Sequence, residues 1–226
     1  MKTLALLCAV LVLATGSAWA TTIIDDFSDG NPDLQNDGTP DPITSTEGSL
    51  SGVLGGERVT VLDVISGASE DPLRQASCVV GGGLLSYSND SGVTSELTLD
   101  YGKNTPLNED LTSDIDFYIN VDSIDLSTDM TVRLWTEGNN GGAADGEETV
   151  TVPSGTSGVF SFPLSNFGIA DLSDVDRVQV EFAGDERVDM DIKAIGTTDV
   201  IPEPATLSLL ALGALALLRR RRRGIR

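Results

Sequence analysis

Short runs in which apolar and polar side chains alternate recur along most of this 226-residue chain. In one such run, Phe117 and Ile119 fall on one side of an extended strand and Tyr118 falls on the other. A period of two is the period of a β-strand, so each run buries one face of a sheet and exposes the other. Between residues 21 and 197, no segment shows a clear 3.6-residue helical period over three turns. The pattern predicts an all-β protein.

Eleven strands are expected, and turn-forming Gly, Asn, Asp, Ser and Pro residues fill the intervals between them. They cover Thr22–Phe27, Arg58–Val64, Ser77–Val80, Leu84–Ser88, Val93–Tyr101, Asp114–Val121, Met130–Thr136, Glu148–Val152, Gly158–Leu164, Asp176–Ala183 and Arg187–Ala194. Many short strands at intervals of roughly 8–15 residues are typical of sandwiches. We therefore predict an antiparallel β-sandwich of the jelly-roll kind over residues 21–197.

The first 20 residues have the features of a secretory signal peptide. Lys2 supplies the positive charge, and Leu4–Leu13 supplies the apolar stretch. Ala18 and Ala20 are the small residues of a cleavage site. The apolar stretch is too short to cross about 30 Å of hydrocarbon, which argues against a membrane anchor. We expect signal peptidase to cut after Ala20 and the chain to be secreted through the inner membrane.

A second apolar stretch, residues 205–218, follows Pro202, Glu203 and Pro204 near the other end of the chain. A basic cluster lies directly after it and contains Arg219, Arg220, Arg221, Arg222 and Arg223. Basic residues stay on the cytoplasmic side, so this cluster would stop a short transmembrane helix in the inner membrane. The stretch is short for a stable span. We therefore expect a transient sorting signal within residues 198–226 rather than an ordinary tail anchor.

The Pro-Glu-Pro motif, the apolar helix and the arginine cluster at 219–226 together resemble the PEP-CTERM sorting signal of Gram-negative bacteria. The resemblance implies recognition by an exosortase, which is a membrane cysteine protease or transpeptidase. It also implies cleavage near Pro202–Pro204 and delivery of the body to the cell surface. Proteins with this signal often accompany exopolysaccharide production and biofilm formation, and some ice-binding proteins carry it. The resemblance covers the tail alone and does not define the function of residues 21–197.

The body between these ends is strongly acidic. The chain has 35 acidic and 14 basic residues, a net charge of −21 and no histidine. Holding phosphate backbones requires a basic face, so the charge argues against nucleic-acid binding. The lack of histidine excludes Ser-His-Asp triads and imidazole metal sites. With Cys8 removed in the signal peptide, Cys78 is the one remaining cysteine, and its apolar neighbours predict a buried thiol.

Five side chains on the polar faces of predicted strands are candidates for binding sugars. They are Tyr118, Asn120, Arg133, Trp135 and Gln179. An aromatic ring covers the apolar face of a sugar, and planar polar groups bind its hydroxyls. If their strands are neighbours, these side chains line one groove. The alternative is that Tyr118 and Trp135 are half-exposed cross-strand residues, or that a loop covers Trp135.

The opening run of the body, Ile23–Phe27, and its closing runs, Asp174–Phe182 and Val188–Ile192, loosely resemble the opening and closing strands of galactose-binding-like jelly rolls. This resemblance supports the fold and not an activity. Among the acidic residues, Asp29, Asn31 and Asp33 have the spacing of the first calcium ligands of an EF-hand loop, although the rest of that motif is missing. Further candidate ligands, since first and last strands often meet, are Asp25, Asp189 and Asp191. Structural calcium is therefore a candidate cofactor, and solvated turns are the alternative.

No Gly-x-Ser-x-Gly elbow, phosphate-binding loop or cysteine–histidine pair occurs in the sequence, so we expect no catalysis. The sequence predicts a secreted, surface-displayed protein that serves as a structural or adhesive component of the extracellular polysaccharide matrix. The alternative is a carbohydrate-binding module that uses Tyr118 and Trp135. A secreted glycan-active enzyme is a third interpretation.

Overall fold

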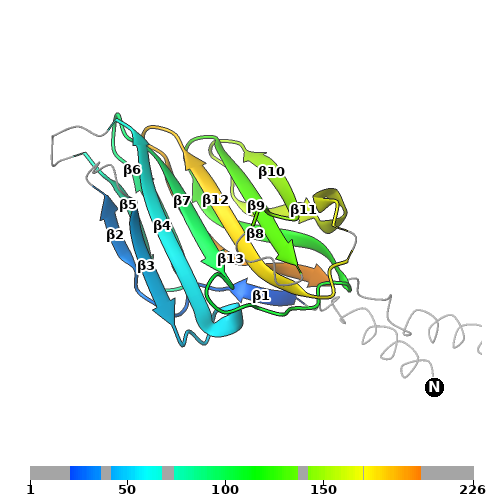
Figure 1. Ribbon diagram of the computed structural model, residues 1–226. Coiled ribbons are helices and arrows are strands. Elements are labelled where there is room, and N and C mark those ends of the chain that lie inside the picture. The colour runs from blue at the N-terminus through cyan, green and yellow to red at the C-terminus, as the bar shows by residue number, and fades with distance from the viewer. Residues whose placement is uncertain (1–20, 37–41, 68–73, 137–141, 170, 200–226) are drawn as a thin grey trace, which may run out of the picture. The chain divides into compact units, whose positions relative to one another are not determined.

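The computed structural model describes residues 21–36, 42–67, 74–136, 142–169 and 171–199 (Figure 1). The predicted signal peptide and the predicted sorting tail lie outside these residues. Within the described ranges, no helix is long and apolar enough to cross a membrane. Two short 3-10 helices, η1 (Leu54–Gly56) and η2 (Leu164–Phe167), stand among the strands.

The strands form two antiparallel sheets. The seven-stranded sheet contains β1 (Thr21–Asp25), β2 (Asp33–Asn36), β5 (Ala76–Gly81), β6 (Leu84–Asn89), β8 (Asp114–Ile124), β11 (Gly158–Pro163) and β13 (Asp189–Asp199). The six-stranded sheet contains β3 (Ile43–Gly48), β4 (Glu57–Ser66), β7 (Thr94–Tyr101), β9 (Thr128–Thr136), β10 (Gly146–Val152) and β12 (Val175–Gly184). Figure 1 shows the two sheets as two layers. Buried apolar side chains from both sheets form the core.

The strand order is that of a jelly roll. In the seven-stranded sheet, four strands lie in the order β6-β13-β8-β11, and in the six-stranded sheet four lie in the order β7-β12-β9-β10. The last strand, β13, returns beside β6, and β12 returns beside β7, which is the wrapping of two Greek keys. The predicted all-β, antiparallel jelly-roll sandwich is confirmed.

All eleven predicted strands form, with ends shifted by a few residues, and two further strands were missed. The missed strands, β2 and β3, each lie at the end of a sheet. Each has a single large apolar side chain, Leu34 in β2 and Ile43 in β3. An edge strand has fewer neighbours to pack against, so its sequence shows little alternation.

Buried polar contacts tie the two sheets together at one end of the sandwich. The Tyr87 hydroxyl on β6 donates to the Ser95 carbonyl on β7 at 2.9 Å. The side-chain amide of Asn89 donates to the Gly184 carbonyl on β12 at 3.1 Å. Because buried polar groups need partners, these bonds favour this one alignment of the two layers.

Cys78 lies in β5 with its side chain fully buried, as expected. Burial raises the pKa of its thiol to about 12. The thiolate is the reactive form, so the native protein is expected to resist a thiol-specific reagent at about pH 8. After unfolding in denaturant, Cys78 should react. Rapid reaction of Cys78 in the native protein would contradict this prediction.

Candidate functional site

The five sugar-binding candidates lie in two different sheets. Tyr118 and Asn120 belong to β8 of the seven-stranded sheet, whereas Arg133 and Trp135 belong to β9 and Gln179 to β12 of the six-stranded sheet. Outward side chains from different sheets point to opposite sides of a sandwich. The five therefore cannot line one groove, which corrects the prediction. Only β9 and β12 are neighbours.

Tyr118 covers a glycine of the next strand instead of projecting as a free ring. It is 8% exposed. Its register partner on β13 is Gly196, where an added Cβ would lie 2.9 Å from the Tyr118 ring. Burial also raises the pKa of the Tyr118 hydroxyl. This packing leaves little of the ring open for stacking on a sugar.

Four polar side chains form a cross-strand row on the outer face of the six-stranded sheet, which we call the polar row. Glu147, Arg133, Gln179 and Asp100 are register partners on β10, β9, β12 and β7. The Arg133 guanidinium donates to Glu147 at 2.6 Å and to Gln179 at 3.1 Å. The Gln179 amide donates to Asp100 at 3.3 Å. The row thus repeats planar polar groups at the strand spacing of about 4.8 Å.

Arg177 and Trp135 support one side of the polar row. The Arg177 guanidinium donates to both carboxylate oxygens of Asp100, at 2.7 and 2.5 Å. The central carbon of the Arg177 guanidinium also lies 4.1 Å from the centroid of the Trp135 ring. This cation–π contact holds the guanidinium over the ring. The Trp135 indole donates to the Gly142 carbonyl at 3.0 Å, and Trp135 is 4% exposed. Trp135 therefore positions Arg177 and is not an open platform, which agrees with the alternative that a loop covers it.

The polar row lies among further acidic groups. Glu181, on β12, accepts a hydrogen bond of 2.5 Å from Arg133. Burial raises the pKa of Glu96 on β7, and the nearby Glu181 carboxylate adds to the rise. Carboxylates repel anions and accept hydrogen bonds from hydroxyls. This face is therefore suited to ligands that carry hydroxyls and no negative charge.

The sequence analysis selected three residues of this face as candidates. Parity along the strands identified Arg133, Trp135 and Gln179 as outward-facing. Parity also placed Arg177 and Glu181 on the polar face, but neither was selected, and Asp100 and Glu147 were not considered. Their contacts depend on which strands are neighbours, and strand order was not predicted.

Asp25, a predicted calcium ligand, binds an arginine inside the sandwich. The pairing of β1 with β13 is irregular between Ile23 and Asp25, and this bulge turns the Asp25 side chain inward. Its carboxylate accepts hydrogen bonds from Arg58 at 2.7 Å and from the Tyr101 hydroxyl at 2.9 Å. We call Asp25, Arg58 and Tyr101 the buried ion cluster. Burial raises the pKa of Asp25, while attraction to Arg58 opposes that rise.

Arg58 also organises the loop that contains Asp29 and Asn31. Its guanidinium donates to the Asp29 carbonyl at 3.1 Å and to the Glu47 carboxylate at 2.8 Å. The Asn31 backbone amide donates to the other oxygen of Glu47 at 2.8 Å. The Asp29 carboxylate accepts two hydrogen bonds from Ser51, at 2.8 and 2.5 Å. One oxygen of this loop, the Asp29 carbonyl, thus binds the guanidinium, while the Asp29 carboxylate binds Ser51.

The remaining calcium candidates lie elsewhere. Asp33 is exposed on β2, and Asp189 is exposed on β13. Asp191 accepts hydrogen bonds from Ser86 at 2.6 Å and from Ser123 at 3.1 Å. Within the described parts of the chain, no three carboxylate or cysteine side chains are grouped so that they could hold a metal ion. Calcium binding stays a prediction from the sequence.

Residues 200–223 match the PEP-CTERM protein-sorting motif. This match confirms the sorting signal that the tail was expected to contain. The motif implies export and a place at the cell surface or outside the cell. No curated protein matches the chain.

Two solved structures illustrate what the body is similar to. One is a family 11 carbohydrate-binding module from Clostridium thermocellum in complex with a β-1,3-1,4-mixed-linked tetrasaccharide. It shares 13% identity, covers 83% of this chain and 100% of its own, and has a TM-score of 0.44. The other is the CBM22-1–GH10 part of xylanase 10B from the same organism, with xylohexaose. It shares 12% identity, covers 82% of this chain and 29% of its own, and has a TM-score of 0.35.

Proposed function

We propose that this chain is an exported, non-catalytic surface protein that binds extracellular polysaccharide through the polar row. The polar row carries the proposal, since it is a preformed set of planar hydrogen-bonding groups on an outer sheet face. The sorting motif supports a location where such polysaccharide is found. The protein would then act as an adhesive component of the matrix, displayed in many copies that each bind weakly.

The geometry of the polar row suits an extended glycan. Register partners on neighbouring strands lie about 4.8 Å apart, close to the length of one sugar residue in an extended chain. Carboxylate, amide and guanidinium groups form paired hydrogen bonds with adjacent hydroxyls. Their contacts to one another hold the donors and acceptors in place before a ligand arrives, which lowers the entropy lost on binding.

Replacing Gln179 by alanine is expected to weaken polysaccharide binding about tenfold, since one lost hydrogen bond to a charged or hydroxyl partner is worth about 1–2 kcal/mol. Gln179 joins Arg133 to Asp100, so the variant also interrupts the row. The probe is extracellular polysaccharide extracted from the producing cells and cast in a native gel. The measurement is the retardation of the exported protein.

The matched control is Gln35→Ala. Gln35 is an exposed glutamine on β2 of the other sheet. It should leave the retardation unchanged. Equal retardation of the wild type and Gln179→Ala would contradict the role of the polar row, and release of reducing sugar from the gel would contradict the absence of catalysis.

A further inference from the structure

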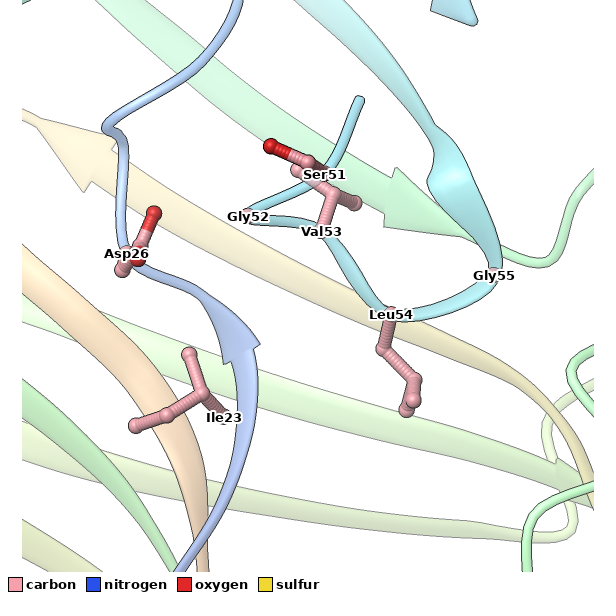
Figure 2. Close-up of a pocket in the computed structure, with 7 residues that line it drawn as sticks. All are labelled: Ile23, Asp26, Ser51, Gly52, Val53, Leu54 and Gly55. Atoms are coloured by element: carbon pink, nitrogen blue, oxygen red, sulfur yellow. The ribbon is translucent and has the colours of Figure 1, made fainter. Parts of the chain in front are cut away.

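A hollow of about 340 Å³ lies between β1 and residues 51–55, which lead into η1 (Figure 2). It is formed by residues of β1, of the turn that follows β1, and of residues 51–55. None of these residues belongs to the polar row. Its volume is at the lower end of the range of about 300–1,000 Å³ found for small-molecule sites.

The backbone of two segments is held together to make this hollow. The Asp26 amide donates to the Gly52 carbonyl at 3.2 Å, and Asp25 and Val53 form an isolated β-bridge. A Cβ atom on Gly52 would overlap the Asp26 carboxylate, so a larger residue at this position would displace the Asp26 side chain. The neighbouring Ser51 is held by its two hydrogen bonds to Asp29. The walls are therefore preformed.

The hollow has an aliphatic end and an oxygen-bearing end. Figure 2 shows the side chains of Ile23 and Leu54 toward one end of the hollow and those of Asp26 and Ser51 toward the other. Ile23 is 40% exposed although it is aliphatic. Asp26 accepts one hydrogen bond, from the Ser28 amide at 2.9 Å, and a carboxylate has room to accept more.

We propose that this hollow binds one neutral sugar residue, such as the end of a glycan chain. A sugar ring has an apolar patch of C–H groups and several hydroxyl donors, which match the Ile23–Leu54 end and the Asp26–Ser51 end. The volume suits about one ring. The hollow therefore takes a terminal residue, whereas the polar row takes the interior of a chain.

Two other ligand classes fit the lining less well. Asp26 is the one charged residue that lines the hollow, so an anionic ligand meets repulsion and no positive partner. A calcium ion requires six to eight oxygens, and five of the seven lining residues are aliphatic or glycine. An organic amine would pair with Asp26 but would leave the hydroxyl-binding groups unused.

The test is a titration of the exported protein with free monosaccharides, followed by NMR through the backbone amides of the lining. The panel contains glucose, galactose, N-acetylglucosamine, rhamnose, glucuronate and ethanolamine. At least one neutral sugar is expected to shift the amides of Ile23, Ser51 and Leu54. Shifts with ethanolamine or glucuronate alone, or with no compound, would overturn the proposal.

Ile23→Glu should weaken the binding of that sugar at least about tenfold, since it places a charge on the aliphatic wall. The matched control is Ile65→Glu, because Ile65 is an exposed isoleucine on β4 that lines a different hollow. A second variant, Asp26→Asn, keeps the acceptor for Ser28 and should also weaken binding. Wild-type affinity in both hollow variants would contradict the assignment.

The two sites are tested separately. Gln179→Ala should leave monosaccharide binding to the hollow unchanged. Ile23→Glu should leave the retardation of the protein in the polysaccharide gel unchanged. Loss of both activities in either variant would show that they share one site, which would overturn the assignment of the hollow as a separate site.

Discussion

Replacing Arg58 by methionine is expected to lower the free energy of unfolding by about 3–5 kcal/mol, because removing one partner of a buried ion pair leaves the other charge uncompensated. Arg58 and Asp25 are both fully buried, and their atoms are 2.7 Å apart. The change also removes the hydrogen bond to the Asp29 carbonyl that holds the loop after β1. The measurement is thermal unfolding, where a decrease in Tm of about 10 °C is expected.

The size of this effect should depend on pH. In the Arg58→Met variant, burial still raises the pKa of Asp25 and no guanidinium opposes the rise. A carboxyl group whose pKa is higher in the folded than in the unfolded state stabilises the folded protein at pH values below its unfolded pKa of about 3.9. This contribution is lost as the pH rises through the folded-state pKa. The stability difference between variant and wild type should therefore shrink as the pH falls from 7 toward about 4.

Two comparisons isolate the buried charge as the cause. Adding Asp25→Asn to Arg58→Met removes the lone carboxylate and should recover part of the lost stability. Arg187→Met is the matched control, because Arg187 is exposed and bonded to Ser91 at 2.9 Å. It should change stability by less than about 0.5 kcal/mol. If Arg58→Met behaved like Arg187→Met, the buried ion cluster would not stabilise the fold.

Changing Pro202, Glu203 and Pro204 together to alanine is expected to stop surface delivery almost completely. The match to the sorting motif spans these residues, and the resemblance implies that the exosortase recognises them. The uncut chain should then stay in the inner membrane through its apolar stretch, with the arginines on the cytoplasmic side. Cell fractionation with detection of the body is the measurement.

The matched control is Thr206→Ala, which changes the tail but keeps the three motif residues. It should be delivered like the wild type. A normal amount of the triple variant at the surface, with its C-terminus cut, would contradict the prediction. This result would leave the glycan-binding proposals unaffected, since those rest on the body.

Most of the fold could be predicted because strand alternation is a local property. The run around Phe117 and Ile119 shows its buried face within eight residues, so β8 was predicted at the right place. The edge strands β2 and β3 were missed because their polar composition shows no such face.

The site was predicted less well because it depends on strand neighbours. Parity showed that Tyr118 and Trp135 face away from the main apolar sets, but it contains no information on which sheet each strand joins. The structure places them on opposite sides of the sandwich and buries both. Likewise, nothing near Arg58 in the sequence marks it as the partner of Asp25, which lies 33 residues away.

The sequence by itself determined the fold class and the sorting signal, because both are encoded in residues that are close along the chain. Alternation sets which face of each strand is buried, and the tail motif is contiguous. Only the tertiary structure decided that Arg133, Gln179 and Asp100 form a row, that Arg58 donates to the loop carbonyl of Asp29, and that a hollow lies beside Ile23. These features arise from pairings between distant segments, and a side chain acquires its partners only when strand order and register bring those segments together.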